Sequence, residues 1–140
     1  MKVLAANNFH YLRGGSERVM FAEHTLLQEN GHRIGCFSRS HPDNLSCEYP
    51  QYFTESANHV GLSGPSRVRH ALNMIRNKEV AREFAAALVD FRPDIVHAHN
   101  IYGGLTTSIL DVAREYRTPV VMTLHDYKPV SYTHLRAHET

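Results

Sequence analysis

Val3-Leu4-Ala5-Ala6 and the later Arg13-Gly14-Gly15-Ser16 decide the fold of this chain. The first stretch is a short apolar run typical of a buried strand, and a helix is expected to begin near Ser16. Gly14 and Gly15 lie between the two elements, so backbone N–H groups and the positive end of the helix dipole should face the sheet edge. The arrangement predicts a cleft that faces an anion such as phosphate. A tight turn without a ligand is the alternative, since glycine is permissive in the left-handed region.

The rest of the chain alternates between helix and strand. The expected strands cover residues 3–6, 33–37, 94–100 and 120–124, and the expected helices cover residues 16–30, 65–76, 78–91 and 105–116. The first helix is expected to end at Gly31 and to bury Val19, Ala22, Leu26 and Leu27. Residues 38–64 show no clear period and are expected to form a long loop. Because strand–helix–strand units join parallel strands by right-handed crossovers, the pattern predicts an α/β fold with a Rossmann-like, doubly wound parallel sheet.

Composition indicates one globular domain. The chain has 140 residues, of which 42% are hydrophobic and 21% charged, which is enough to bury a core. Fifteen basic and fourteen acidic residues give a formal net charge of +1, so no nucleic-acid partner is expected. Cys36 and Cys47 lack the spacing of a metal site or a disulfide framework, and no stretch approaches the ~20 apolar residues of a membrane span. We expect a cytoplasmic protein, with peripheral contact at the inner face of the membrane left open.

Polar residues follow the carboxyl ends of the expected strands and should meet at one edge of the sheet. His99 and Asn100 follow the third strand and are expected to hydrogen-bond a polar substrate. His125 follows the fourth strand directly and is the residue that we expect to carry chemistry, with Asp126 orienting it or capping the turn. A structural role, in which His125 and Asp126 only hold the loop, is the alternative. His97 lies deeper in its strand and is expected to be a hydrogen-bonded core histidine.

Two other patterns favour ordinary structural explanations. The stretch Arg13-Gly14-Gly15-Ser16-Glu17-Arg18 lacks three spaced glycines, and Phe37-Ser38-Arg39 ends the second strand without an acid for a ribose, so NAD is not expected. The helix expected over residues 65–76 carries basic side chains on its flanks and is interpreted as a packed crossover helix with solvated edges. Contact of that helix with anionic lipid is the alternative.

A metal site is a further hypothesis. His97, His99, His125 and Asp126 would supply nitrogen and oxygen ligands to a zinc or manganese ion of a hydrolase. All ligands of such an ion lie within about 2.2 Å of it. Because His97 is expected too far down its strand to reach the same ion, we expect no metal.

Five stretches follow one another along the chain: Lys2-Val3-Leu4 to Asn8, Arg13-Gly14-Gly15-Ser16-Glu17-Arg18, Gly31-His32, Pro93-Asp94-Ile95-Val96-His97-Ala98-His99-Asn100 and Thr123-Leu124-His125-Asp126-Tyr127. Together they resemble the amino-terminal domain of family 4 glycosyltransferases. Enzymes of that family have two Rossmann-like domains facing a cleft, the GT-B architecture. The amino-terminal domain mainly binds the acceptor and the carboxyl-terminal domain holds the nucleotide-sugar. Transfer proceeds with retention and usually without a metal.

The resemblance implies roles for the residues at the predicted cleft. Gly14 and Gly15 would lie beside the donor diphosphate, where N–H donors stabilise the charge of the departing nucleoside diphosphate. His125 would contact the transferred sugar. The residues implied to face the substrates are His99, Asn100, the loop Tyr102-Gly103-Gly104 and Asp126. The resemblance implies no cofactor, because the nucleotide-sugar is a co-substrate.

The resemblance covers about residues 2–130, and the expected domain is 1–130. The carboxyl-terminal donor domain of the family does not follow, so we expect a fragment that is inactive alone. Residues 131–140 stop following the family, resemble a translated sequencing-adaptor tail and are expected to be non-native and disordered. The expected function is the acceptor side of a retaining hexosyl- or related transferase, which uses a nucleotide-sugar and a glycan or lipid-linked acceptor. Alternatives are a non-catalytic phosphate- or sugar-binding α/β module and, third, a metal-dependent hydrolase.

Overall fold

The structure is a computed structural model that describes residues 1–58, 68 and 76–125. Asp126, the tail 131–140 and the helix expected over residues 65–76, apart from Val68 and Arg76, lie outside the described residues. Strands β1 (Lys2–Ala6), β2 (Arg33–Arg39), β3 (Phe53–Thr54), β4 (Ile95–Ala98) and β5 (Val120–Met122) form one sheet. The helices are α1 (Gly15–Glu29), α3 (Lys78–Phe91) and α4 (Ser108–Glu115), and a short 3-10 turn, η1, spans Pro50–Tyr52.

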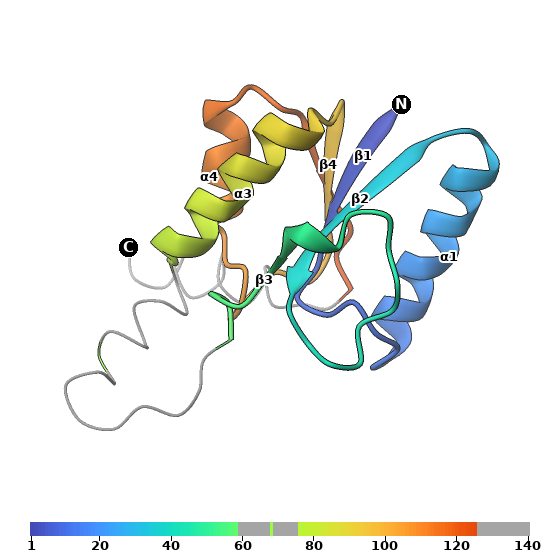
Figure 1. The fold of residues 1–140 in the computed structure, drawn as a ribbon, viewed down its shortest axis with the longest axis horizontal. Coiled ribbons are helices and arrows are strands. Elements are labelled where there is room, and N and C mark those ends of the chain that lie inside the picture. The colour runs from blue at the N-terminus through green and yellow to red at the C-terminus, as the bar shows by residue number, and fades with distance from the viewer. Residues whose placement is uncertain (59–67, 69–75, 126–140) are drawn as a thin grey trace, which may run out of the picture.

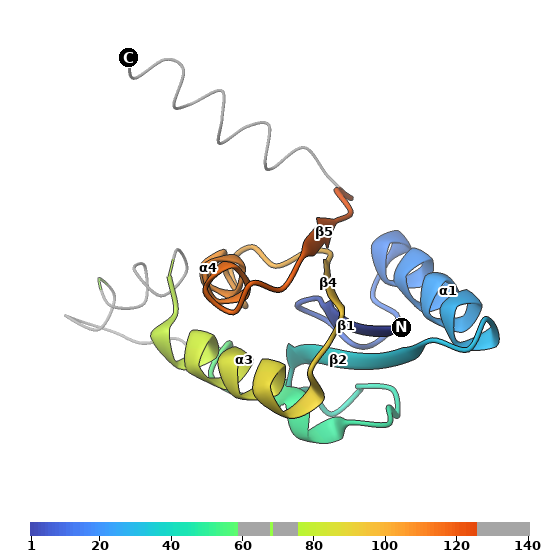
Figure 2. The ribbon, with the colours of Figure 1, turned by 90° about the horizontal axis from the view of Figure 1, so that it is seen from above.

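The sheet is parallel throughout, in the order β3-β2-β1-β4-β5. The order reverses at β1, where the chain leaves toward β2 on one side and later returns as β4 on the other. Helix α1 covers one face of the sheet, while α3 and α4 cover the other (Figures 1 and 2). This is the Rossmann-like doubly wound arrangement, so the expected fold class is confirmed.

Two apolar layers hold the sheet between its helices. Alternate residues of a strand point to opposite faces. Leu4 and Val96 therefore pack with Phe84 in the larger core under α3 and α4, whereas Val3 and Ile34 belong to a smaller cluster on the α1 side. Together these layers make the sheet a fixed platform for the loops that follow its strands.

Helix α3 spans the residues that the periodic pattern predicts. Val80, Phe84 and Leu88 recur every four residues and are all buried. The side chain of Asn77 caps the helix, because its Oδ1 accepts a hydrogen bond from the Val80 N–H at 3.2 Å. Asn77 was not foreseen as a cap, although Asn is a favoured residue at this position.

Helix α1 buries a different face from the one expected. Val19 and Leu26 are 47% and 59% exposed, and Ala22 is exposed as well. The buried residues are instead Glu17, Met20 and His24. The apolar-face prediction is wrong for Val19, Ala22 and Leu26, because α1 lies over the polar strand ends, where Glu17 accepts a hydrogen bond from Asn7 and His24 meets the ring of His99. Leu27 is partly buried and packs against the smaller apolar cluster on the α1 side, as expected. The predicted stop is correct, since Gly31 has a φ of +84°.

Other elements also differ from the expectation. The stretch 38–64 contains a strand, β3, which pairs with the end of β2 through only two residues. Helix α4 begins at Ser108 rather than near residue 105. Strand β5 is not buried as expected: Val120 and Val121 are 37% and 50% exposed, because β5 pairs only with β4 among the described residues. A two-residue strand such as β3 leaves no apolar period in the sequence, and the apolar run of β5 does not reveal that the strand lies at an edge of the described sheet.

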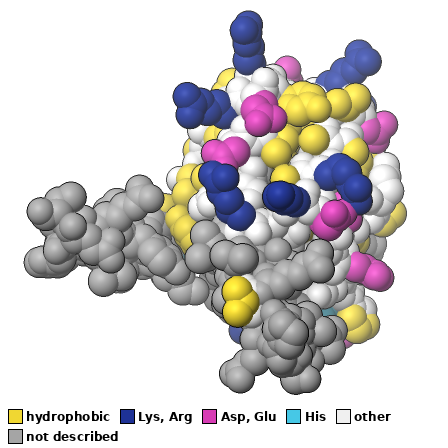
Figure 3. All heavy atoms as spheres, turned by 90° about the vertical axis from the view of Figure 1, so that its left-hand side faces the viewer, with side chains coloured by type: hydrophobic (Ala, Val, Ile, Leu, Met, Phe, Trp, Pro, Cys, Tyr) yellow, Lys and Arg dark blue, Asp and Glu magenta, His cyan; other side chains and the backbone are white. Residues whose placement is uncertain are grey.

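The surface over α3 and α4 carries charges of both signs. In the view of that side, Lys and Arg side chains are interspersed with Asp and Glu around apolar atoms, without a large patch of one sign (Figure 3). This mixture agrees with the formal net charge of +1. Among the described residues, no helix combines the length and apolar character needed to span a bilayer.

Candidate functional site

The ends of β1 and β4 lie side by side at the point where the strand order reverses. The backbone N–H of Asn8 donates to the Asn100 carbonyl oxygen at 2.8 Å, and that of His99 donates to the Ala6 carbonyl oxygen at 2.8 Å. Ligands of open α/β sheets bind outside the carboxyl ends of the strands at such a switch point. The structure therefore brings His99 and Asn100 to the expected edge.

Asn7 ties three elements together at this edge. Its Oδ1 accepts a hydrogen bond from the Asn100 N–H at 3.0 Å, and its Nδ2 donates to the Phe9 carbonyl oxygen at 2.6 Å. The same Nδ2 lies 3.4 Å from Oε1 of Glu17 in α1. Asn7 is only 2% exposed, so these bonds satisfy a buried amide. The side chain positions the edge; the sequence located Asn7 at the end of the first strand but assigned no role to it.

Asn8 holds the loop after β4. Its Oδ1 accepts from the Leu105 N–H at 2.9 Å, and its Nδ2 donates to the Tyr102 carbonyl oxygen at 2.8 Å. A Cβ added to Gly104 would lie 2.4 Å from Asn8 Oδ1, so the loop approaches Asn8 as closely as only glycine permits. Gly103 beside it has a φ of +73°. The expected substrate loop, Tyr102 to Gly104, is therefore fixed by Asn8. The available signal in the sequence was its position two residues beyond the end of β1.

The glycine pair stands at the beginning of α1. Gly14 precedes the helix with an extended backbone, and Gly15 is its first residue. Both residues are exposed, and a Cβ added to Gly15 would meet nothing within 4 Å. Neither φ is positive, unlike those of Gly31 and Gly103, so left-handed turn geometry is not the reason for glycine here. The phosphate-facing role remains a prediction.

His99 and His125 form a hydrogen-bonded pair. His99 Nδ1 lies 3.0 Å from His125 Nε2, and the rings stack with centroids 5.3 Å apart. Burial, followed by the neighbouring histidines, lowers the pKa of His99 to about 3, so its ring is neutral at neutral pH. The structure thus brings together two of the histidines that the sequence singled out. Asp126, the third member of that group, is outside the described residues.

His97 lies closer to this pair than expected. Its ring centroid is 4.1 Å from that of His99, and its Nε2 lies 2.7 Å from Thr123 Oγ1, which confirms the expected hydrogen bond. The expectation that His97 is too deep to share a site with His99 is wrong, because both side chains point toward Glu23 of α1. These three residues could hold a cation, since their ligand atoms lie within 4.8 Å of one another. Glu23 was not identified from the sequence.

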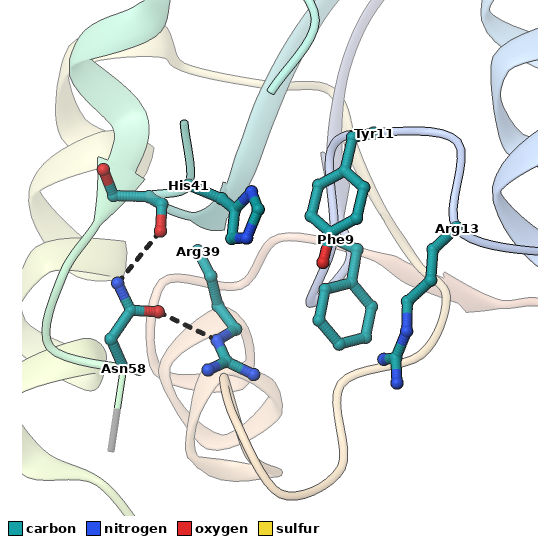
Figure 4. Close-up of a pocket in the computed structure, with 7 residues that line it drawn as sticks. Phe9, Tyr11, Arg13, Arg39, His41 and Asn58 are labelled. Carbon is teal, nitrogen blue, oxygen red and sulfur yellow. Dashed lines mark hydrogen bonds between the residues drawn. The ribbon is translucent and has the colours of Figure 1, made fainter. Parts of the chain in front are cut away.

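A polar cavity opens beside the glycine pair. It measures about 420 Å³ and is lined by Phe9, Tyr11, Arg13, Arg39, Ser40, His41 and Asn58 (Figure 4). The guanidiniums of Arg13 and Arg39 lie 4.2 and 5.5 Å from the Phe9 ring centroid. Asn58 holds the Arg39 side chain in place, because Arg39 Nε donates to Asn58 Oδ1 at 3.0 Å. The cavity offers two cations and aromatic faces to a ligand, and no acidic side chain is among the described residues that line it.

The sequence comparisons agree with this architecture. Residues 13–139 match the profile of Glycosyltransferase Family 4. A relative from Klebsiella pneumoniae, described as an uncharacterised 42.6 kDa protein in the cps region, is 27% identical over 91% of this chain. The chain spans 37% of the length of that relative. Because the family profile covers most of the sequence, from the glycine pair to past β5, the chain belongs to glycosyltransferase family 4.

Proposed function

We propose that this chain is the acceptor side of a retaining hexosyl- or related transferase, which moves a sugar from a nucleotide-sugar to a glycan or lipid-linked acceptor. One observation carries the proposal. In a family 4 chain, the cationic cavity at Arg13 and Arg39 and the His99–His125 pair lie at the same carboxyl edge of one parallel sheet. The residues that would bind the acceptor and those that would act on the sugar therefore lie on the same side of the domain.

The cavity suits an anionic acceptor. Two guanidiniums present forked N–H donors that match phosphate or carboxylate oxygens. Tyr11 and His41 stack with ring centroids 4.4 Å apart and close one wall of the cavity (Figure 4). The diphosphate of a lipid-linked acceptor, or the carboxylate of an acidic glycan, would lie against Arg13 and Arg39, with the sugar rings against the aromatic wall.

The transfer step would use the edge beside this cavity. His125 would contact the sugar as the glycosidic bond breaks, and buried His99 would hold the imidazole of His125 in place. The exposed backbone at Gly14 and Gly15 would face the diphosphate that accumulates negative charge. Interactions that strengthen in the transition state raise turnover. The step as proposed requires no metal, because the N–H donors and the basic residues of a donor domain stabilise the leaving group.

The proposal places the donor on a second domain. Residues 1–130 would form the acceptor domain, and a carboxyl-terminal domain of the whole protein would hold the nucleotide-sugar. The span of 37% of the relative's length leaves room for such a domain. The complete enzyme would act in the cytoplasm, with peripheral contact at the inner membrane face if its acceptor is lipid-linked.

The test uses the complete gene product, radiolabelled UDP- and GDP-sugars, and free-glycan and lipid-linked acceptors. We expect transfer with retention, read from the anomeric configuration of the product by NMR. Arg39→Gln should raise the KM for the acceptor and leave the KM for the donor unchanged. Arg82→Gln, at an exposed arginine of α3, is the matched control and should change neither. Tight binding of a nucleotide-sugar without turnover would contradict the transferase and favour the non-catalytic binding module.

A further inference from the structure

Glu23 faces two histidines across a gap that is too wide for hydrogen bonds. Its Oε2 lies 3.8 Å from Nδ1 of His97 and 4.0 Å from Nε2 of His99. Glu23 Oε2 and His99 Nε2 are both buried and have no hydrogen-bond partner among the described residues. Leaving a buried polar atom unpaired is destabilising. Glu23 Oε2, His97 Nδ1 and His99 Nε2 surround one gap, and this arrangement indicates a ligand that binds all three atoms.

The outer nitrogen of each histidine is already engaged. His97 Nε2 lies 2.7 Å from Thr123 Oγ1, and His99 Nδ1 lies 3.0 Å from His125 Nε2. Histidines that bind metals are usually held in this way, with one ring nitrogen on the ion and the other bonded to a supporting group. Here both inner nitrogens point toward the same carboxylate oxygen of Glu23. The rings are thus oriented for a ligand between α1 and β4.

We infer that Glu23, His97 and His99 bind one transition-metal ion of the zinc class in this gap, with a fourth position open to water. Two imidazole nitrogens and one carboxylate oxygen suit zinc, whereas magnesium and calcium prefer an all-oxygen set. Bonds of about 2.0–2.1 Å place tetrahedral ligands about 3.4 Å apart. The observed 3.8 and 4.0 Å therefore require Glu23 Oε2 to approach the two ring nitrogens by about 0.5 Å. The two ring nitrogens lie within 4.8 Å of each other.

The surroundings permit that approach. The side chain of Glu23 is 35% exposed and can shift, whereas that of His99 is 1% exposed and fixed. An ion here would join α1 to the β4 end and, through His99, fix the orientation of His125. The proposed site shares no residue with the described lining of the arginine cavity, and it does not depend on the proposed transfer reaction.

The test measures zinc binding by the purified, untagged chain after treatment with a chelator and gel filtration. Competition with a chromophoric chelator should give one bound zinc ion per chain. Cobalt in its place should give the strong visible absorption of a tetrahedral site. Glu23→Gln should weaken zinc binding by at least about tenfold, and Thr123→Val, which removes the support of His97, should weaken it by about tenfold. Glu29→Gln is the matched control, because it removes an exposed carboxylate from the same helix; it should bind zinc as the wild type does.

Nitrogen chemical shifts of the histidine rings in the wild-type chain test the site even if a variant fails to fold. Adding one equivalent of zinc should shift His97 Nδ1 and His99 Nε2 and leave the His10 ring unchanged. The inference is overturned if the wild-type chain binds no zinc, if Glu23→Gln and Glu29→Gln bind it equally well, or if the ring shifts occur at other histidines.

Discussion

His99 Nδ1 lies 3.0 Å from His125 Nε2, so a side chain that is 1% exposed fixes the orientation of a partly exposed one. The two residues come from loops that follow adjacent strands, β4 and β5. The pair therefore exists only once these strands have aligned. It offers one oriented imidazole at the open edge of the sheet.

This pair predicts the kinetics of a variant of the complete enzyme. If the contact of His125 with the sugar tightens as the bond breaks, His125→Ala should lower kcat more than it raises the KM for the donor. Steady-state kinetics with a varied nucleotide-sugar concentration separate the two effects. Full activity of the variant would refute the catalytic assignment, and a change confined to KM would reduce His125 to a ground-state contact.

The beginning of α1 predicts a second effect on the complete enzyme. A Cβ added at Gly15 meets nothing within 4 Å, so we expect Gly15→Val to leave the melting temperature nearly unchanged. The same side chain would obstruct the approach of the donor diphosphate and raise the KM for the nucleotide-sugar. Ala22→Val, at an exposed position farther along α1, is the control and should leave that KM unchanged. Equal KM values for the two variants would show that Gly14 and Gly15 only begin α1 and do not contact the donor diphosphate.

The contact between Asn8 and Gly104 predicts a loss of stability. Gly104→Ala places a Cβ 2.4 Å from Asn8 Oδ1, which must move and release its bond to Leu105. We expect the free energy of unfolding to fall by about 1–3 kcal/mol, as for other overpacked sites. Urea unfolding of the chain measures this change. Gly15→Ala, where the added Cβ enters open space, is the control. Equal stability of the two variants would show that the loop adapts to the added methyl group.

Buried histidines predict acid sensitivity. Burial between the rings of Phe21 and Phe53 lowers the pKa of His10 from 6.5 to about 4. Between these two values the unfolded chain binds a proton that the folded chain does not. The contribution of His10 is therefore complete above pH 6.5 and is lost as the pH falls toward 4, with a slope of up to about 1.4 kcal/mol per pH unit.

His10→Leu should remove this contribution, because leucine fills the apolar site without titrating. Urea unfolding of the wild type and the variant at several pH values across this window compares the two slopes. His24, whose pKa is also lowered to about 4, should keep a residual slope in the variant. An unchanged slope in His10→Leu would show that His10 does not contribute to acid unfolding.

The fold could be predicted because its main elements carry local signals. The apolar repeat of Val80, Phe84 and Leu88 defines α3, and the apolar run before the glycine pair defines β1. The buried face of α1 could not be predicted by hydrophobicity. That helix packs on amides and imidazoles, so Glu17 and His24 turn inward while Val19 turns outward. Tertiary hydrogen bonds and ring contacts outweighed the helical apolar pattern there.

The site was predictable only in part, for a similar reason. Strand ends can be located from sequence, and they led to His99, Asn100 and His125. Residues that come from other elements carry no such signal. Glu23 lies within a helix and Asn58 in a loop, and each meets the site only through the packing of the whole domain.

The central claim is that this chain supplies one side of a nucleotide-sugar-dependent transfer. Release of nucleoside diphosphate from UDP- and GDP-sugars, compared between the complete gene product and residues 1–140 alone, tests it most directly. We expect acceptor-dependent release by the complete protein and none by the isolated chain, because the proposed donor domain supplies half of the transition-state binding. Turnover by residues 1–140 alone, or no release by the complete protein with any donor and acceptor, would contradict the account.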